Sequence, residues 1–192
     1  MSYSANKSPI RLEALNLSDA DNLFLFINSN RQYLKRYFPV TIEENKSTKD
    51  SKAYVINKIK RRKDKKEYVF TLKLGEENRI NGLVIIKELK WDLGRAELAY
   101  CIDNEFRNLG WMTIAVQKIL YFTFETLGLS VIEILSHKTN NPSIRVAEKC
   151  GFKWVRTLKE SFKPPGEEYL DMELYEKTNE GKILPVYRTT TG

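Results

Sequence analysis

The chain has 192 residues, 42% of them hydrophobic and 30% charged, so we expect one globular domain with a sizeable core. It contains no run of about 18 apolar residues and its first residues lack the apolar core of a signal peptide, which argues against a membrane protein and for a cytoplasmic one. The formal charge of +7 favours acidic partners, while two cysteines and one histidine predict neither a disulfide nor a metal site.

The first part of the chain reads as a strand followed by helices. Residues 10–15 alternate as a strand does, and the polar run 18–21 caps a helix whose apolar residues begin at Leu23. We expect Pro39 to stop the segment that comes next. Before that proline, large side chains recur at helical spacing: Tyr33, Leu34, Tyr37 and Phe38. Such spacing fits a core stripe as well as a binding surface.

A polar loop over residues 41–51 and a helix over residues 52–66 are expected to follow. The helix carries the densest basic run of the chain, between Lys58 and Lys66, without interleaved aromatic residues. Clustered Lys and Arg bind phosphates with release of counterions, so RNA is one partner that would fit this run. A solvated helix face opposite the core is the alternative.

Strands and two further helices are predicted for the rest of the chain. Residues 68–74, 80–87 and 95–102 read as an antiparallel meander. A helix over residues 113–127 then crosses to a buried strand at residues 131–136, which we expect to be parallel to its predecessor.

The chain is expected to close with a short helix and a hairpin. The helix covers residues 142–150, and the hairpin strands cover residues 152–157 and 168–175. We take residues 1–177 as a single domain and residues 178–192, which show no periodicity, as a loosely held tail.

The turn between the strand 95–102 and the next helix is a candidate anion site. It reads Arg-Asn-Leu-Gly-Trp-Met-Thr from Arg107 to Thr113. A helix that opens there points its first free N–H groups and the positive end of its dipole toward a ligand, and a pyrophosphate fits such a turn. The plain alternative is that Gly110 only eases a tight connection.

Two motifs resemble those of the GNAT superfamily of acetyl-CoA-dependent N-acetyltransferases. The family's Q/R-x-x-G-x-G/A motif matches at Arg107 and Gly110, with Met112 at its last position. A second motif, from an asparagine through a serine to Glu-Lys-x-Gly-Phe, matches between Asn140 and Phe152. The group that the chain most resembles is that of the ribosomal-protein N-terminal acetyltransferases (RimJ/RimL-like), over nearly the whole chain.

This resemblance implies a mixed α/β fold of the acyl-CoA N-acyltransferase type, with a mostly antiparallel sheet, a parallel and splayed pair of strands at the cofactor cleft, and flanking helices. It also implies acetyl-CoA as cofactor, and an acceptor groove walled by the segment that holds Tyr33, Leu34, Tyr37 and Phe38. The expected cofactor contacts are Cys101, Ile102, Arg107, Asn108, Leu109, Gly110, Trp111, Met112, Thr113, Asn140 and Lys149.

Acetyl transfer to an amine needs a base for the ammonium proton and an acid for the leaving thiolate. Glu97 is the main candidate for the base, and a salt bridge to Arg95 or another cation is its structural alternative. Glu160 is a second candidate, implied by the resemblance. Many GNAT enzymes use a tyrosine as the acid where this chain has Ala147. We expect Ser143 to bond the sulfur instead, or else to cap its helix.

We therefore expect an acetyl-CoA-dependent N-acetyltransferase that modifies an amine by direct attack on the thioester, above all the N-terminal α-amine of a protein. A polyamine or aminoglycoside acetyltransferase stays open, and so does a non-catalytic module that binds acetyl-CoA or RNA. The resemblance adds a homodimer as a further expectation.

Overall fold

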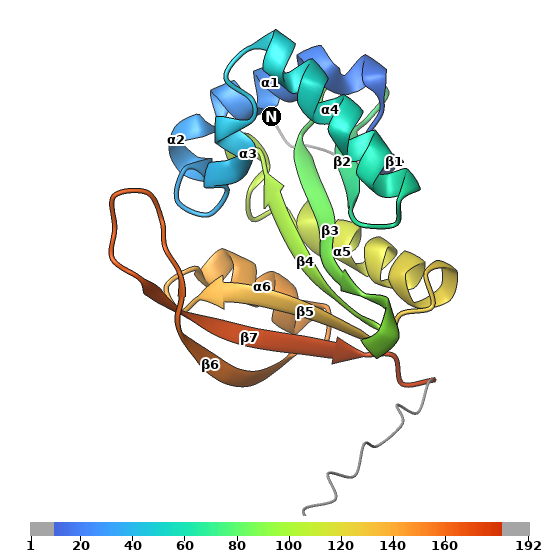
Figure 1. Ribbon diagram of the computed structural model, residues 1–192, viewed down its shortest axis with the longest axis vertical. Helices are drawn as coiled ribbons and strands as arrows, with labels where there is room; N and C mark the ends of the chain where they lie inside the picture. Colours follow the sequence, from blue (N-terminus) through green and yellow to red (C-terminus); the bar gives the residue numbers. More distant parts are fainter. Residues whose placement is uncertain (1–9, 182–192) are drawn as a thin grey trace, which may run out of the picture.

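The computed structural model describes residues 10–181, which form a seven-stranded sheet with helices on both faces (Figure 1). The strand order is β1-β2-β3-β4-β5-β7-β6, and only β4 and β5 are parallel neighbours. The strands are β1 (Ile10–Ala14), β2 (Tyr68–Leu74), β3 (Gly82–Lys90), β4 (Arg95–Ile102), β5 (Val131–His137), β6 (Lys153–Phe162) and β7 (Leu170–Thr178). This is the mixed, mostly antiparallel sheet that was predicted.

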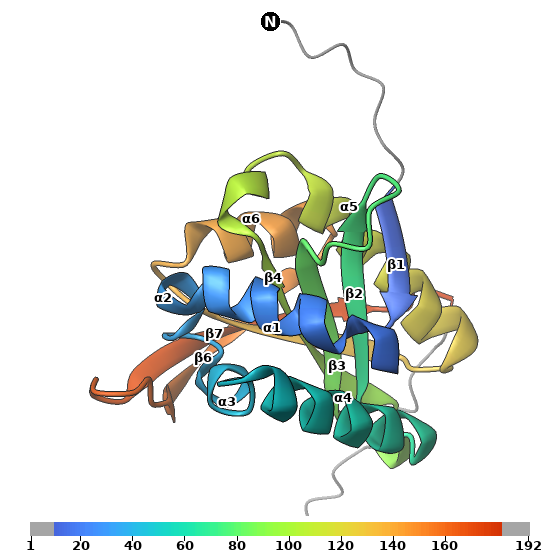
Figure 2. The ribbon, with the colours of Figure 1, turned by 90° about the horizontal axis from the view of Figure 1, so that it is seen from above.

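Helices α1 and α4 lie on one face of the sheet and α5 and α6 on the other (Figure 2). The helices are α1 (Ala20–Ser29), α2 (Arg31–Leu34), α3 (Pro39–Glu43), α4 (Thr48–Lys63), α5 (Trp111–Tyr121) and α6 (Asn141–Lys149). A π-helical turn, Phe122–Thr126, extends α5. Within residues 10–181, none of the helices combines the length and the apolar character that spanning a bilayer requires.

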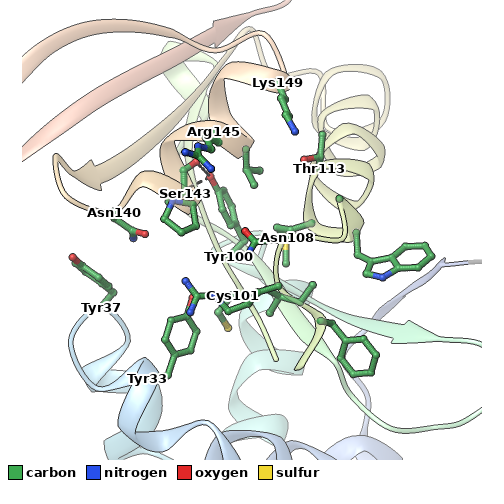
Figure 3. Close-up of a pocket in the computed structure, with 18 of the residues that line it drawn as sticks. Tyr33, Tyr37, Tyr100, Cys101, Asn108, Thr113, Asn140, Ser143, Arg145 and Lys149 are labelled. Atoms are coloured by element: carbon green, nitrogen blue, oxygen red, sulfur yellow. Dashed lines mark hydrogen bonds between the residues drawn. The ribbon is translucent and has the colours of Figure 1, made fainter. Parts of the chain in front are cut away.

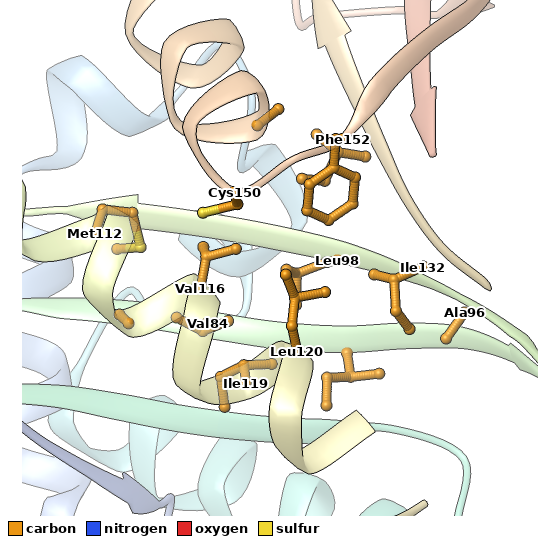
Figure 4. Packing of buried hydrophobic residues seen from close by; sticks show 14 of the residues in the cluster. Val84, Ala96, Leu98, Met112, Val116, Ile119, Leu120, Ile132, Cys150 and Phe152 are labelled. Atoms are coloured by element: carbon orange, nitrogen blue, oxygen red, sulfur yellow. The ribbon is translucent and has the colours of Figure 1, made fainter. Parts of the chain in front are cut away.

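Alternating side chains of β4 enter two separate apolar layers. Leu98 packs with Val84 and Val116 in the layer under α5 (Figure 4), whereas Cys101 packs in the layer under α1 and α4. Burying one aliphatic side chain of this size stabilises a protein by roughly 1.5–3 kcal/mol. Because β4 is held from both faces, its position relative to α5 and α1 is well defined.

The parallel pair β4 and β5 separates soon after it begins. The two strands pair at Arg95–Val131, Ala96–Ile132 and Glu97–Glu133 only, and from there to Ile102 β4 pairs with β3 alone. Figure 1 shows the two strands diverging toward the side where α2 lies. The predicted splay is thereby confirmed, and it leaves strand backbone groups that a ligand can satisfy.

Two predictions for the segment after α1 are wrong. Pro39 does not stop a helix but begins α3, because a proline at the first helical position loses no hydrogen bond. The expected loop over residues 41–51 contains the rest of α3 and the start of α4. Ser47 caps α4 by accepting from the N–H of Asp50, a local signal that the polar composition concealed.

Several predicted boundaries also move. The helix after the anion-site turn begins at Trp111, two residues before the expected Thr113. Both closing strands are longer than predicted, and β7 continues to Thr178, where the backbone pairs with Val131. Most of the predicted tail over residues 178–192 lies outside the described residues, which end at residue 181.

Candidate active site

A first cleft of about 290 Å³ lies where the end of β4, the start of α5, α6 and α2 come together (Figure 3). All but one of the predicted cofactor contacts line it: Cys101, Ile102, Arg107, Asn108, Gly110, Trp111, Met112, Thr113, Asn140 and Lys149. The exception is Leu109, whose side chain is 60% exposed and is not among the lining residues. A turn, a strand end and a helix start thus converge on one hollow.

The turn into α5 is shaped to leave backbone amides open. Asn108 and Gly110 both have positive φ, +62° and +82°, and Gly110 is the N-cap of α5. No side chain caps this helix end, and no heavy atom lies within 4 Å of where a Cβ on Gly110 would stand. The first amides of α5 therefore face free space with the positive end of the helix dipole behind them, which suits a phosphate group.

Basic side chains surround the same cleft. Arg107 places its guanidinium 4.8 Å from the centroid of the Tyr33 ring and donates to Asn104 Oδ1 at 3.3 Å. Arg145 and Lys149 line the cleft from α6, one turn apart and exposed (Figure 3). Arg145 was not predicted from the sequence, although its position one helical turn before Lys149 places both side chains on the same face of the helix. These cations favour an anionic ligand.

Tyr100 and Ser143 join β4 to α6 across the cleft. Tyr100 Oη donates to the Ser143 carbonyl at 2.8 Å, and Ser143 Oγ donates to Tyr100 Oη at 3.2 Å (Figure 3). Burial raises the pKa of Tyr100, so its phenol stays protonated at neutral pH. The hydroxyl of Ser143 thus bonds a side chain and is not a helix cap. Sequence reasoning missed Tyr100, whose place on an alternating strand looked purely structural.

A second cleft, of about 250 Å³, lies in the gap that β4 and β5 leave between them. Its polar side chains include Glu97, Ser136 and His137. Five residues line both clefts, namely Tyr37, Phe38, Tyr100, Asn140 and Ser143. The two hollows therefore meet beside the Tyr100–Ser143 pair, where ligands from either side would come into contact.

Glu97 lies in the second cleft and is already ion-paired. Its carboxylate, 16% exposed, is 2.8 Å from the Lys87 ammonium, which stands directly opposite on β3. Arg95, the cation first considered for this role, instead contacts Glu133 and Glu176. Of the residues that line the two clefts, Glu97 is the single acidic one.

His137 lines the second cleft, and its Nδ1 atom is already engaged by Thr139. The backbone N–H of Thr139 donates to His137 Nδ1 at 3.3 Å, and Thr139 Oγ1 lies 2.8 Å from the same nitrogen. Since Nδ1 accepts, the proton of the neutral ring belongs on Nε2. Burial lowers the pKa of His137, which keeps the ring neutral at pH 7.

The predicted acceptor residues divide between the clefts. Tyr33 and Leu34 line the first cleft alone, whereas Tyr37 and Phe38 line both. Glu160, the second candidate base, is exposed on β6 and lines neither cleft. Its assignment as a base stays a prediction without support from its position.

A family model described as the acetyltransferase (GNAT) domain matches residues 10–153. This chain belongs to the GNAT acetyltransferase family. Members of the family take their acetyl group from acetyl-CoA, so this GNAT enzyme is an acetyl-CoA-dependent N-acetyltransferase. The protein YdaF of Bacillus subtilis (strain 168), named as a ribosomal N-acetyltransferase, is 28% identical over 143 residues, which cover 74% of this chain and 77% of YdaF.

Solved structures with the same fold extend over nearly the whole chain. Ribosomal-protein-S5-alanine acetyltransferase from Vibrio fischeri superimposes with a TM-score of 0.81 at 20% identity, covering 89% of this chain and 93% of that one. RimL, the ribosomal L7/L12 α-N-protein acetyltransferase in complex with coenzyme A, gives a TM-score of 0.82 at 17% identity, covering 93% and 97%. The fold expected from the sequence motifs is therefore confirmed.

Proposed function

We propose that this GNAT enzyme acetylates the N-terminal α-amine of a protein. The observation that carries the proposal is the charge of the second cleft, where Glu97 is the single carboxylate and is paired with Lys87. A polyamine carries several positive charges and would need several acidic partners. A peptide brings one ammonium group and an otherwise neutral backbone, which suits one carboxylate among aromatic side chains. The names of YdaF, RimL and the Vibrio fischeri enzyme support the same acceptor class.

The first cleft is proposed to hold acetyl-CoA, which supplies the activated acetyl thioester. The open amides at the start of α5, with Arg107 and Lys149 beside them, would bind its phosphates. The splayed end of β4, at Cys101 and Ile102, offers backbone groups for the pantetheine arm, and Asn140 offers an amide on the opposite wall. The fit rests on features that this structure shows: uncapped amides, unpaired strand edge and surrounding cations.

Three residues near the point where the two clefts meet have proposed roles in the acetyl transfer. Glu97 accepts the proton that the acceptor ammonium loses, directly or through a water. In the free enzyme the Ser143 hydroxyl donates to Tyr100 Oη. When the cofactor is bound, this hydroxyl is proposed to turn and donate to the sulfur of the leaving group, while Tyr100 Oη keeps donating to the Ser143 carbonyl. Burial raises the pKa of the Cys101 thiol to about 12, so the thiol is protonated at neutral pH and is a poor nucleophile. Direct attack by the amine is therefore the proposed route.

The test is an acetyl-CoA consumption assay with two acceptor panels, short peptides with free N-termini and polyamines. Turnover of peptides at least tenfold faster than of polyamines is the expected result. The substitution Glu97→Gln should lower turnover strongly near neutral pH and less at high pH, where free amine is abundant. Preference for polyamines would overturn the acceptor class, and an equal loss at every pH would move Glu97 from base to positioning residue.

A further inference from the structure

Ser136 is a buried hydroxyl without a partner in the part of the chain that the structure describes. Its side chain, on β5, is 2% exposed, and Oγ makes no hydrogen bond with residues 10–181. Buried polar atoms almost always find a partner, because leaving one unpaired costs folding free energy. An unpaired buried hydroxyl in a residue that lines an enzyme cleft therefore calls for an explanation.

Two other buried hydroxyls of this chain are satisfied, whereas Tyr54 Oη, which lines neither cleft, is likewise buried without a hydrogen-bond partner among the described residues. Ser51, which is 0% exposed on α4, donates to Asn45 Oδ1 at 2.6 Å. Thr123 donates to the Leu120 carbonyl at 2.8 Å. The fold can therefore pair a buried hydroxyl, and Ser136 differs from Tyr54 and from the paired residues by lining the second cleft.

The position of Ser136 in the sheet explains why it has no partner. Pairing of β5 with β4 ends at Glu133, three residues earlier, and β4 then turns away. Had the parallel register continued, Ser136 would stand beside Tyr100. The splay removes the β4 neighbour of Ser136, so the residue borders the gap on that side, while on its other side β5 pairs it with Glu173 of β7.

The two clefts differ in whether they include this residue. Ser136 lines the second cleft and is not among the residues that line the first. A ligand in the second cleft, close to the point where Asn140 and Ser143 join both clefts, is therefore the partner that residues 10–181 leave open to this hydroxyl. The carboxylate of Glu97 lines the same hollow.

We propose that Ser136 Oγ hydrogen-bonds the amine of the bound acceptor and orients it for attack. The inference rests on the proposed acetyl transfer to an amine in the second cleft. An amine N–H donates to Oγ, which is uncharged and accepts up to two hydrogen bonds. No proton moves in this contact, since the proton lost by the ammonium goes to Glu97. Ser136 thus binds the amine substrate, and its unpaired hydroxyl lowers the folding stability of the free enzyme.

The test compares Ser136→Ala with Ser51→Ala, the same change at two buried serines. For Ser136→Ala we expect kcat/KM for the acceptor to fall about tenfold, acetyl-CoA affinity to stay unchanged, and Tm to stay level or rise. Ser51→Ala removes the hydrogen-bond donor of Asn45 Oδ1. For this variant we expect unchanged kinetics and a Tm lower by about 2–4 °C. The acceptor is whichever amine the wild-type enzyme turns over fastest.

A third variant, Ser136→Cys, nearly keeps the side-chain volume but offers only a weak hydrogen-bonding group, so it should lose as much activity as Ser136→Ala. Full activity in the cysteine variant would show that volume matters and would overturn the proposal. So would an acceptor kcat/KM of Ser136→Ala within twofold of wild type, or an equal loss in acetyl-CoA affinity. If the wild-type enzyme acetylates no amine, the proposed function is wrong, and this inference, which depends on it, is wrong as well.

Discussion

At the scale of single residues, Tyr100 brings a hydroxyl to the cleft beside Ser143, where the helix position Ala147 has none. Ala147 is fully buried in the layer under α6, so it offers no polar group to a leaving thiolate. Tyr100 reaches the same neighbourhood from β4 and exchanges two hydrogen bonds with Ser143. Because burial raises the pKa of Tyr100, its phenol is a steady donor and a poor source of a proton at neutral pH. We expect it to act by holding Ser143.

A double-mutant cycle tests this coupling. Tyr100→Phe should lower kcat about three- to tenfold with little change in the KM for acetyl-CoA, since the ring remains and only the hydroxyl is lost. Ser143→Ala should lower kcat by a similar factor, and the double variant should be no worse than either single one. If the two losses multiply, Tyr100 acts independently of Ser143. If Tyr100→Phe lowers only Tm, the contact is a structural tie between β4 and α6.

At the scale of elements, two segments far apart in sequence meet beside the second cleft, which Tyr37 and Phe162 line. Arg36, just after α2, donates through Nε and Nη2 to Glu167 Oε2 at 3.2 and 2.8 Å, although 131 residues separate them. Beside this pair, Tyr37 stacks on Phe162 with ring centroids 6.4 Å apart. The loop between β6 and β7 is thereby tied to the α2–α3 segment beside the place where we expect the acceptor.

This tie is weak enough to open. Both side chains of the Arg36–Glu167 pair are more than a third exposed, and such pairs contribute about 0.2–1 kcal/mol. Arg36→Ala should therefore change Tm by less than about 2 °C. It should lower kcat/KM for the acceptor several-fold, because the loop between β6 and β7 is then held less firmly beside the second cleft. The swap of Arg36→Glu with Glu167→Arg should recover part of the loss. Unchanged acceptor kinetics in Arg36→Ala would show that the pair has no part in binding.

At the scale of the whole molecule, the basic run on and after α4 is partly used by the fold itself. Lys58 and Arg61 both pair with Glu67, at 2.9 and 2.5 Å, and Arg62 donates to the Leu15 carbonyl. Other members of the run are exposed: Lys60, Lys63, Lys65 and Lys66. The helix lies on the sheet face opposite α5 and lines neither cleft (Figure 2). Its free charges can act only on a large acceptor.

Changing those four exposed lysines to glutamate should leave kcat/KM for a short peptide within about twofold of wild type, because none of them lines either cleft and exposed charges are screened at physiological salt. If the acceptor is presented on a ribosome, the same variant should lose association rate at low salt, and the loss should shrink as salt rises. A loss on the short peptide would instead place the run within the catalytic machinery.

Alternation and motif spacing are local properties of a chain, and from them the strands, most of the helices, the anion-site turn and the cleft-lining residues Glu97, Asn140 and Ser143 could be predicted. The prediction for the start of α3 was wrong, since a proline stops one helix and begins another according to its surroundings. The resemblance implied a splayed pair of strands, but the residue at which β4 and β5 separate, Glu97, and the contacts beside the gap depend on long-range packing and emerged from the structure.

Those contacts join residues that no local pattern connects. Tyr100 meets Ser143 from another element, Arg36 meets Glu167 across most of the chain, and Ser136 is left without a partner within the described residues. In the sequence, Ser136 looks like any small residue of a buried strand, and Tyr100 looks like any aromatic residue of a strand with alternating polarity. Their chemistry follows from where the sheet opens, and that depends on the packing of both helix layers together.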